Sequence, residues 1–184
     1  MNNQRNEICE EKRFEMYFEN QRPEMFRYIP PKVSRVLDVG CSNESFGQCL
    51  KLEHSVEVWG IEPNEPAAEI TVQKLDKVIC NIFTRDLDPP KRYFDCVVFN
   101  DVLEHLVDPY DALLYAKQFL QPQGVVTSIP NVRHFDNIWN LMIHKDWKYS
   151  EWGILDKTHL TTVRTILDCQ RANAGFSLFT EVKC

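Results

Sequence analysis

The stretch RVLDVGCSNESFG at Arg35–Gly47, with VWGIEPN at Val58–Asn64, decides the fold. In the first stretch an apolar run ends at Gly40 and gives way to a polar turn. In the second, an apolar run ends on an acid, Glu62. Parallel α/β sheets bind nucleotides with this pattern, because a glycine turn lets backbone N–H groups approach the ligand and the acid accepts hydrogen bonds from the ribose hydroxyls. Since the loop has only Gly40 and Gly47, an ordinary strand–turn–helix with a surface acid stays an alternative.

The composition is that of one globular domain, residues 1–184, with 43% apolar and 26% charged residues. The net charge of −6 argues against a nucleic-acid surface, and no apolar run is long enough to span a bilayer. The N-terminal stretch is polar and acidic, unlike a secretory signal. The 7 cysteines show no CxxC spacing. We therefore expect a reduced, cytoplasmic protein without a metal site or membrane insertion.

Hydrophobic periodicity predicts strands that alternate with helices. The predicted strands are Arg35–Val39, Val56–Ile61, Lys77–Cys80, Phe94–Asn100, Val125–Ile129 and Phe176–Val182, and the predicted helices are 7–28 (within the helical segment 1–30), 45–52, 65–75, Pro109–Leu120 and 161–174. Pro23 should break the first helix, Asn64 should cap the third, and Gln123–Gly124 should form a turn. This order predicts an α/β fold, a doubly wound, Rossmann-like and mainly parallel sheet with helices on both faces.

Residues 131–160 interrupt this alternation. They contain Trp139, Trp147 and Trp152, three of the four tryptophans, and three of the five histidines. Because they follow the fifth strand, we expect them to lie over the carboxyl edge of the sheet, as an acceptor site or lid. A structural role for the tryptophans, in the core or a lid, is the simpler interpretation.

With NDVLEHLVDP at Asn100–Pro109 added, the chain resembles the class I S-adenosylmethionine-dependent methyltransferases. It is similar above all to bacterial methyltransferases that accompany glycosyltransferases in surface-polysaccharide pathways. The other motifs that carry the resemblance are YFENQRPEM at Tyr17–Met25, IPNVRH at Ile129–His134 and GILDKTHL at Gly153–Leu160. Each motif is weak alone, whereas their order and spacing together are fairly specific.

The resemblance implies S-adenosylmethionine as the cofactor and a role for each matching residue. Asp38 and the backbone of residues 40–42 would line the methionine end, Glu62 would hold the ribose diol, and Asn100 would offer its carbonyl to the ammonium group. The residues that the resemblance places around the cofactor are Asp38, Gly40, Cys41, Ser42, Glu62, Pro63, Asn81, Ile82, Asn100, Asp101, Val102 and His105. His105 facing solvent, and Glu104 complementing the N-terminus of the next helix, are the structural alternatives.

The chain departs from the family pattern in its glycine loop, where Ser42 and Glu44 replace glycines. Glu44 could repel the carboxylate of the cofactor. The last strand, Phe176–Val182, stands where the family usually has a two-strand hairpin, which leaves the hairpin apparently incomplete. We expect this strand to be an edge that can pair with a second chain in a homodimer.

These observations predict a methyltransferase, with O-methylation of a sugar in a surface glycan or its precursor as the preferred reaction. His134 and His159 are the candidate general bases, since an unperturbed histidine titrates near neutrality. Each could instead be a packing residue. A cofactor-binding or scaffold protein with impaired catalysis is the alternative, and a small-molecule (quinone-type) methyltransferase is a further one.

Overall fold

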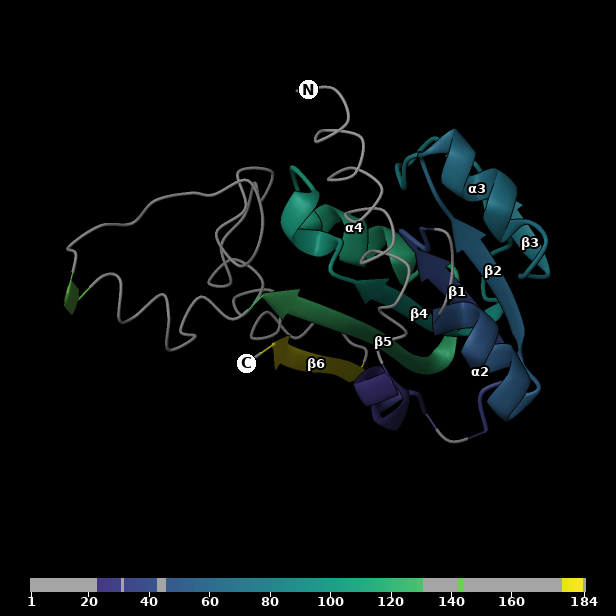
Figure 1. Cartoon of the computed structure of the whole chain (residues 1–184), viewed down its shortest axis with the longest axis horizontal. Helices are drawn as coiled ribbons and strands as arrows, with labels where there is room; N and C mark the ends of the chain where they lie inside the picture. Colours follow the sequence, from purple (N-terminus) through teal and green to yellow (C-terminus); the bar gives the residue numbers. More distant parts are fainter. Residues whose placement is uncertain (1–22, 31, 43–45, 131–141, 144–176, 184) are drawn as a thin grey trace, which may run out of the picture.

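The computed structural model describes residues 23–30, 32–42, 46–130, 142–143 and 177–183. Its centre is a six-stranded sheet in the order β3-β2-β1-β4-β5-β6, in which every pair of neighbours is parallel. The strands are β1 Arg35–Val39, β2 Glu57–Ile61, β3 Lys77–Ile79, β4 Phe94–Asn100, β5 Leu120–Pro130 and β6 Ser177–Lys183. The helices are η1 Pro23–Tyr28, α2 Phe46–His54, α3 Glu65–Thr71, η2 Leu103–His105 and α4 Pro109–Ala116. The predicted doubly wound sheet is therefore confirmed (Figure 1).

Two faces of the sheet carry separate halves of the core, because side chains alternate along each strand. On one face, Leu37 and Val97 pack with Leu113 of α4. On the other face, Val36 packs with Leu50 of α2, and Met25 of η1 belongs to the same cluster. Helices therefore cover both faces, as predicted.

The predicted bounds of β1 and β4, which are mostly apolar, agree with the structure. The predicted extent of the helix after β4 is wrong. It ends at Ala116 rather than Leu120, because Leu120 pairs with Phe94 at the start of β5. The predicted turn at Gln123–Gly124 is also wrong, since both residues belong to β5, next to an irregularity in its register with β4.

Helix α3 is also shorter than predicted. Asn64 caps α3 as expected, accepting a hydrogen bond from the Ala67 N–H at 3.0 Å, but the helix ends at Thr71 rather than at residue 75. Near the N-terminus, Pro23–Tyr28 forms a 3₁₀ helix and residues 1–22 lie outside the described residues, as does the predicted helix 161–174.

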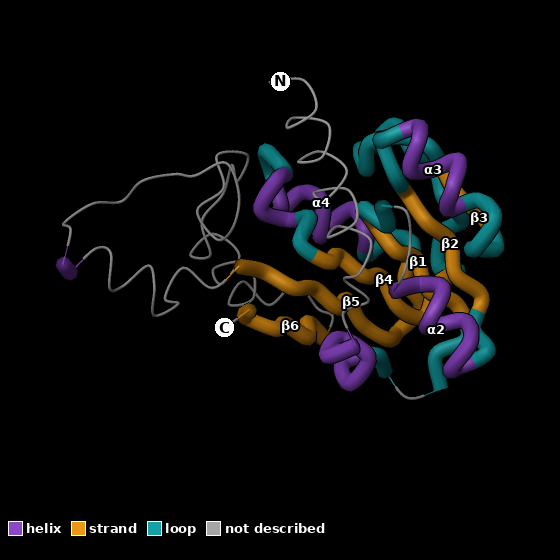
Figure 2. Tube along the Cα trace, in the orientation of Figure 1, coloured by secondary structure: helices purple, strands orange, loops and turns teal. Residues whose placement is uncertain are grey.

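Strand β6 lies beside β5 at one end of the sheet, and β3 lies at the other (Figure 2). The predicted last strand is thus confirmed within one residue, and in the described residues only β5 pairs with it. Its pairing with a second chain stays a prediction. No helix among the described residues is long and apolar enough to cross a membrane.

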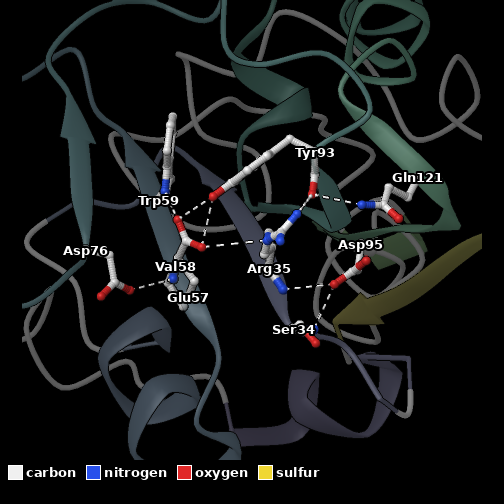
Figure 3. Close-up of polar contacts among 9 residues, drawn as sticks. All are labelled: Ser34, Arg35, Glu57, Val58, Trp59, Asp76, Tyr93, Asp95 and Gln121. Atoms are coloured by element: carbon white, nitrogen blue, oxygen red, sulfur yellow. Dashed lines mark hydrogen bonds and ion pairs between the residues drawn. The ribbon is translucent and has the colours of Figure 1, made fainter.

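The strands begin at what we call the amino edge of the sheet, where polar side chains are tied together (Figure 3). Glu57 accepts hydrogen bonds from the Trp59 ring N–H at 2.6 Å and the Tyr93 hydroxyl at 3.0 Å, and it pairs with Arg35 at 3.8 Å. Asp95 accepts from the backbone N–H groups of residues 34 and 35 at 2.8 and 2.9 Å. These bonds join β1, β2 and β4 where the chain enters them.

Candidate functional site

Most of the predicted site residues lie at the opposite, carboxyl edge of the sheet. They stand at the ends of β1 (residues 38–42), β2 (62 and 63), β3 (81 and 82) and β4 (100–102, with 105 shortly after). Because β3, β2, β1 and β4 are consecutive parallel neighbours, the four loops leave the sheet side by side. The topology therefore brings these predicted residues to one edge.

The loop after β1 stays attached to β2 beyond the end of the strand. The backbone N–H groups of Gly40 and Cys41 both donate to the carbonyl of Ile61, at 2.7 and 3.2 Å. Gly40 has a φ of 73°, and a Cβ there would lie 2.4 Å from Cγ2 of Val102 in the loop after β4. Glycine is needed at this position, because a side chain would both strain the backbone and collide with Val102.

Glu62 is 7% exposed at the end of β2, and backbone groups orient its carboxylate. Oε2 accepts a hydrogen bond from the Ser42 N–H at 2.7 Å, and Oε1 accepts one from the Asn64 N–H at 2.8 Å. An ionised carboxylate has about four acceptor positions. Two backbone donors therefore leave capacity for two further donors. The sequence predicted this acid as a site residue, but not its anchoring.

The loop after β4 combines buried polar groups with an unusual backbone. Both polar atoms of the Asn100 side chain are buried, and neither has a hydrogen-bond partner in the described structure. Asp101 follows with a φ of 54°, in the left-handed region. Buried amides normally find partners, so an unpaired one next to such a residue indicates a functional position.

The 3₁₀ turn η2 follows β4 and contains Glu104 and His105. Glu104 is 2% exposed and lies in the first turn of η2. Helix α4 begins later, at Pro109, and is capped by Asp108, whose side chain accepts from the Asp111 N–H at 2.9 Å. His105 is exposed, and its contact with the cofactor stays a prediction.

The loop after β3 presents Asn81 and Ile82 at the surface. Ile82 is 56% exposed, and its N–H donates to Oδ1 of Asn81 at 2.8 Å. Phe83 then turns into the core against Phe99 and Tyr115. This anchor was not predicted from the sequence, although a single aromatic residue in a polar loop is a signal that could have indicated it.

An ion pair and a hydrogen bond connect the same loop to α4. Nε of Arg85 donates to Oδ2 of Asp111 at 2.9 Å, and this bond from Arg85 holds the pKa of Asp111 below its ordinary value. The Tyr115 hydroxyl donates to the carbonyl of Leu87, and burial raises the pKa of Tyr115. These contacts hold the segment that follows residues 81 and 82 against α4. The two residues in each contact are far apart in the sequence, so no local sequence pattern predicts them.

Several predicted residues fall outside the described part of the chain. They are Glu44, which departs from the glycine pattern, and the candidate bases His134 and His159 with most of the 131–160 segment. Among the residues that are described, no group of three His, Cys, Asp or Glu side chains could hold a metal ion. The described cysteines, at 41, 49, 80 and 96, form no disulfide with one another.

Comparisons with known proteins agree with this architecture. A family model described as a methyltransferase domain matches residues 5–179. A SAM-dependent methyltransferase from Thermotoga maritima superimposes with a TM-score of 0.66 at 20% identity, covering 90% of this chain and 77% of its own. One from Archaeoglobus fulgidus gives 0.62 at 25% identity, covering 84% and 66%.

A third solved structure is the plantazolicin methyltransferase BpumL in complex with a pentazolic desmethylPZN analogue and S-adenosylhomocysteine (SAH). It gives a TM-score of 0.62 at 14% identity and covers 89% of this chain and 70% of its own. No curated protein matches the chain. The family model spans nearly all of the sequence, and the solved neighbours share the fold. The chain therefore belongs to the methyltransferase-domain family, and it is an S-adenosylmethionine-dependent methyltransferase.

Proposed function

We propose that S-adenosylmethionine binds across the carboxyl ends of β1 to β4, with Glu62 accepting hydrogen bonds from both ribose hydroxyls. The observation that carries this proposal is the state of the Glu62 carboxylate. It is buried, backbone donors from residues 42 and 64 fix its orientation, and about two acceptor positions are left for a diol.

Other groups at the same edge fit the remaining parts of the cofactor. Asn100 has a buried side-chain amide without a partner in the described structure, together with a backbone carbonyl at the end of β4. An amide supplies both a donor and an acceptor, which suits the amino-acid end of the cofactor. Asn81 and Ile82 would flank the adenine, where the exposed Ile82 side chain offers an apolar surface.

When bound, S-adenosylmethionine supplies a methyl group on a positively charged sulfur, which is already an activated electrophile. The protein then has to orient the acceptor and exclude water. If the acceptor is a hydroxyl group, a base must take its proton, and we propose His134 or His159 for this role. Asp38, which is 2% exposed at the end of β1, would help to position the methionine end.

We further propose that the acceptor is a hydroxyl group of a sugar in a surface glycan or its precursor. The support is the order and spacing of the motifs, together with the tryptophans of segment 131–160, which suit stacking on a sugar face. The fold itself does not select the acceptor. BpumL, for example, is named for plantazolicin.

Calorimetric titration with SAH tests the cofactor site. Glu62→Ala removes the proposed acceptor of both ribose hydroxyls, and we expect a loss of about 2–3 kcal/mol of binding, roughly 30- to 150-fold in affinity. A folded variant with wild-type affinity would show that the ribose is held elsewhere.

The acceptor proposal needs a separate test, in which methyl transfer is assayed on sugar acceptors. His134→Ala and His159→Ala should preserve SAH binding, and loss of the base should lower turnover by roughly 10²–10⁴-fold. Full turnover in both single variants and in the double variant would mean that these histidines are structural.

A further inference from the structure

Ser42 is held from both sides by side chains that come from outside its loop. Its N–H donates to Oε2 of Glu62 at 2.7 Å, and its carbonyl accepts from the hydroxyl of Thr71 at 2.6 Å. Ser42 has a φ of 51°, in the left-handed region, at a position where the resembling enzymes carry glycine. We call Thr71, Ser42 and Glu62, with these two bonds, the Ser42 clamp.

Helix α3 connects the two sides of the clamp. Near its start, the Asn64 N–H donates to the other oxygen of Glu62 at 2.8 Å, and Asn64 caps the helix. At its end, Thr71 is fully buried and turns its hydroxyl toward the Ser42 carbonyl. One short helix therefore supports both Glu62 and the loop to which Glu62 is bonded.

We propose that Thr71 is a positioning residue for cofactor binding. Its hydroxyl holds Ser42 in the left-handed conformation, and in this conformation the Ser42 N–H donates its hydrogen bond to Glu62. This inference rests on the proposed cofactor site. It adds a residue that neither the glycine pattern nor the acid at the end of β2 identifies.

The physical reason lies in the backbone of Ser42. The left-handed conformation costs conformational free energy in a residue with a Cβ, but not in glycine. A serine in this conformation therefore needs compensating contacts. Removing the Thr71 hydroxyl leaves the Ser42 carbonyl without its donor, and Ser42 loses one of the two hydrogen bonds that hold its backbone on either side of Cα. If Ser42 rotates, Glu62 loses the N–H that orients its Oε2, and the carboxylate is no longer prearranged for the ribose.

The binding test compares two substitutions at the same position by titration with SAH. Thr71→Val keeps the shape but removes the hydroxyl, and we expect affinity to fall roughly 3- to 12-fold, the equivalent of one hydrogen bond. Thr71→Ser keeps the hydroxyl and should bind within about twofold of wild type. Tyr93→Phe is the matched control, because it removes a hydroxyl donor at the amino edge. It should leave SAH affinity unchanged.

Amide hydrogen exchange reports the mechanism without ligand or turnover. In the ligand-free wild type, the Ser42 N–H should exchange slowly, and in Thr71→Val it should exchange faster while the amides of β4 stay as they are. Fast exchange of the Ser42 N–H in the wild type would overturn the clamp, and this outcome needs no variant to fold. Weaker binding by Thr71→Val with unchanged Ser42 exchange would also overturn it.

The two proposals fail in different ways. If Glu62→Ala weakens SAH binding but Thr71→Val neither weakens it nor changes Ser42 exchange, the cofactor site stands and the clamp is wrong. If Glu62→Ala leaves affinity unchanged, the cofactor site is wrong and the clamp loses its role in binding.

Discussion

The amino edge and the carboxyl edge of the sheet differ in how their buried and half-buried polar groups are satisfied. At the amino edge, the carboxylates of Glu57, Asp76 and Asp95 each accept at least two hydrogen bonds. The side chains of Glu57 and Asp76 are 34% and 38% exposed, so water can reach their remaining acceptor positions. At the carboxyl edge, Glu62 also accepts two hydrogen bonds but is only 7% exposed, and the amide of Asn100 is buried without a partner in the described structure. Buried polar groups with unused hydrogen-bonding capacity are therefore found at the carboxyl edge, where a ligand could use them.

Backbone strain alone does not make this distinction. Left-handed residues other than glycine occur before β1, β2 and β4, at Lys32, Ser55 and Arg92, as well as after β1 and β4, at Ser42 and Asp101. The two edges differ in the acceptor to which the N–H of the left-handed residue donates. At the amino edge, Ser55 closes α2, because its N–H donates to the Lys51 carbonyl at 3.0 Å. At the carboxyl edge, the turn at Ser42 directs its N–H to a side chain of the candidate site.

Two matched substitutions, one at each edge, test whether the edges differ in function. Glu62→Ala should produce the largest effect, the roughly 30- to 150-fold loss of SAH affinity expected above. Glu57→Ala removes the same side chain five residues earlier and should lower the free energy of unfolding by about 1–2 kcal/mol, because the Trp59 and Tyr93 donors lose their acceptor. Its SAH affinity should stay within about twofold of wild type. Chemical denaturation and calorimetry on both variants measure the two quantities.

Asn100→Leu tests a second polar group of the carboxyl edge, and we expect a smaller effect on SAH affinity. Leucine has a similar size, so the substitution removes a buried amide that has no partner in the described structure. We expect the ligand-free protein to be as stable as wild type or more stable by up to about 1 kcal/mol, since the desolvation cost disappears. SAH affinity should fall roughly 3- to 12-fold. A loss of stability with unchanged affinity would show that the amide is a structural group of β4.

The sequence predicted the sheet well, because its signals are local and strong. β1 and β4 are mostly apolar and rich in β-branched or aromatic residues, and both are found with the predicted bounds. The end of α4 was predicted wrongly because Phe119 and Leu120 continue the helical spacing of apolar residues. The carbonyl of Phe119 instead accepts from the N–H groups of Tyr93 and Phe94, so pairing with the entrance of β4 decides where the strand begins.

The site was predictable where the chain itself carries the pattern, as at Gly40 and Glu62. Thr71 could not be found in this way, because its hydroxyl serves a carbonyl 29 residues away. The sequence also does not predict that the amide of Asn100 is buried without a partner in the described structure, because both properties depend on how the chain packs around it. Topology thus follows from local patterns, whereas the polar contacts that orient the site depend on the tertiary structure.

The smallest expected effect concerns the pH dependence of the amino edge. Burial raises the pKa of Asp76, but the hydrogen bonds from Lys51 and the Val58 N–H, both 2.8 Å long, and the charge of Lys51 outweigh it and set the pKa below its ordinary value of 3.8. A carboxyl whose pKa is lowered by folding stabilises the protein above its unfolded pKa, and this contribution is lost as the pH falls through the folded pKa.

Asp76→Asn should therefore lower the free energy of unfolding near pH 7 by under about 1 kcal/mol, since Asp76 is partly exposed, and this difference should vanish well below pH 4. Lys51→Met is the matched variant from the other side of the ion pair. A double-mutant cycle by denaturation should show coupling between the two residues at pH 7 that disappears in acid. SAH affinity should stay unchanged in the two single variants and in the double variant. Coupling that is absent at pH 7, or that persists in acid, would mean that the Lys51–Asp76 contact contributes no charge-dependent stability.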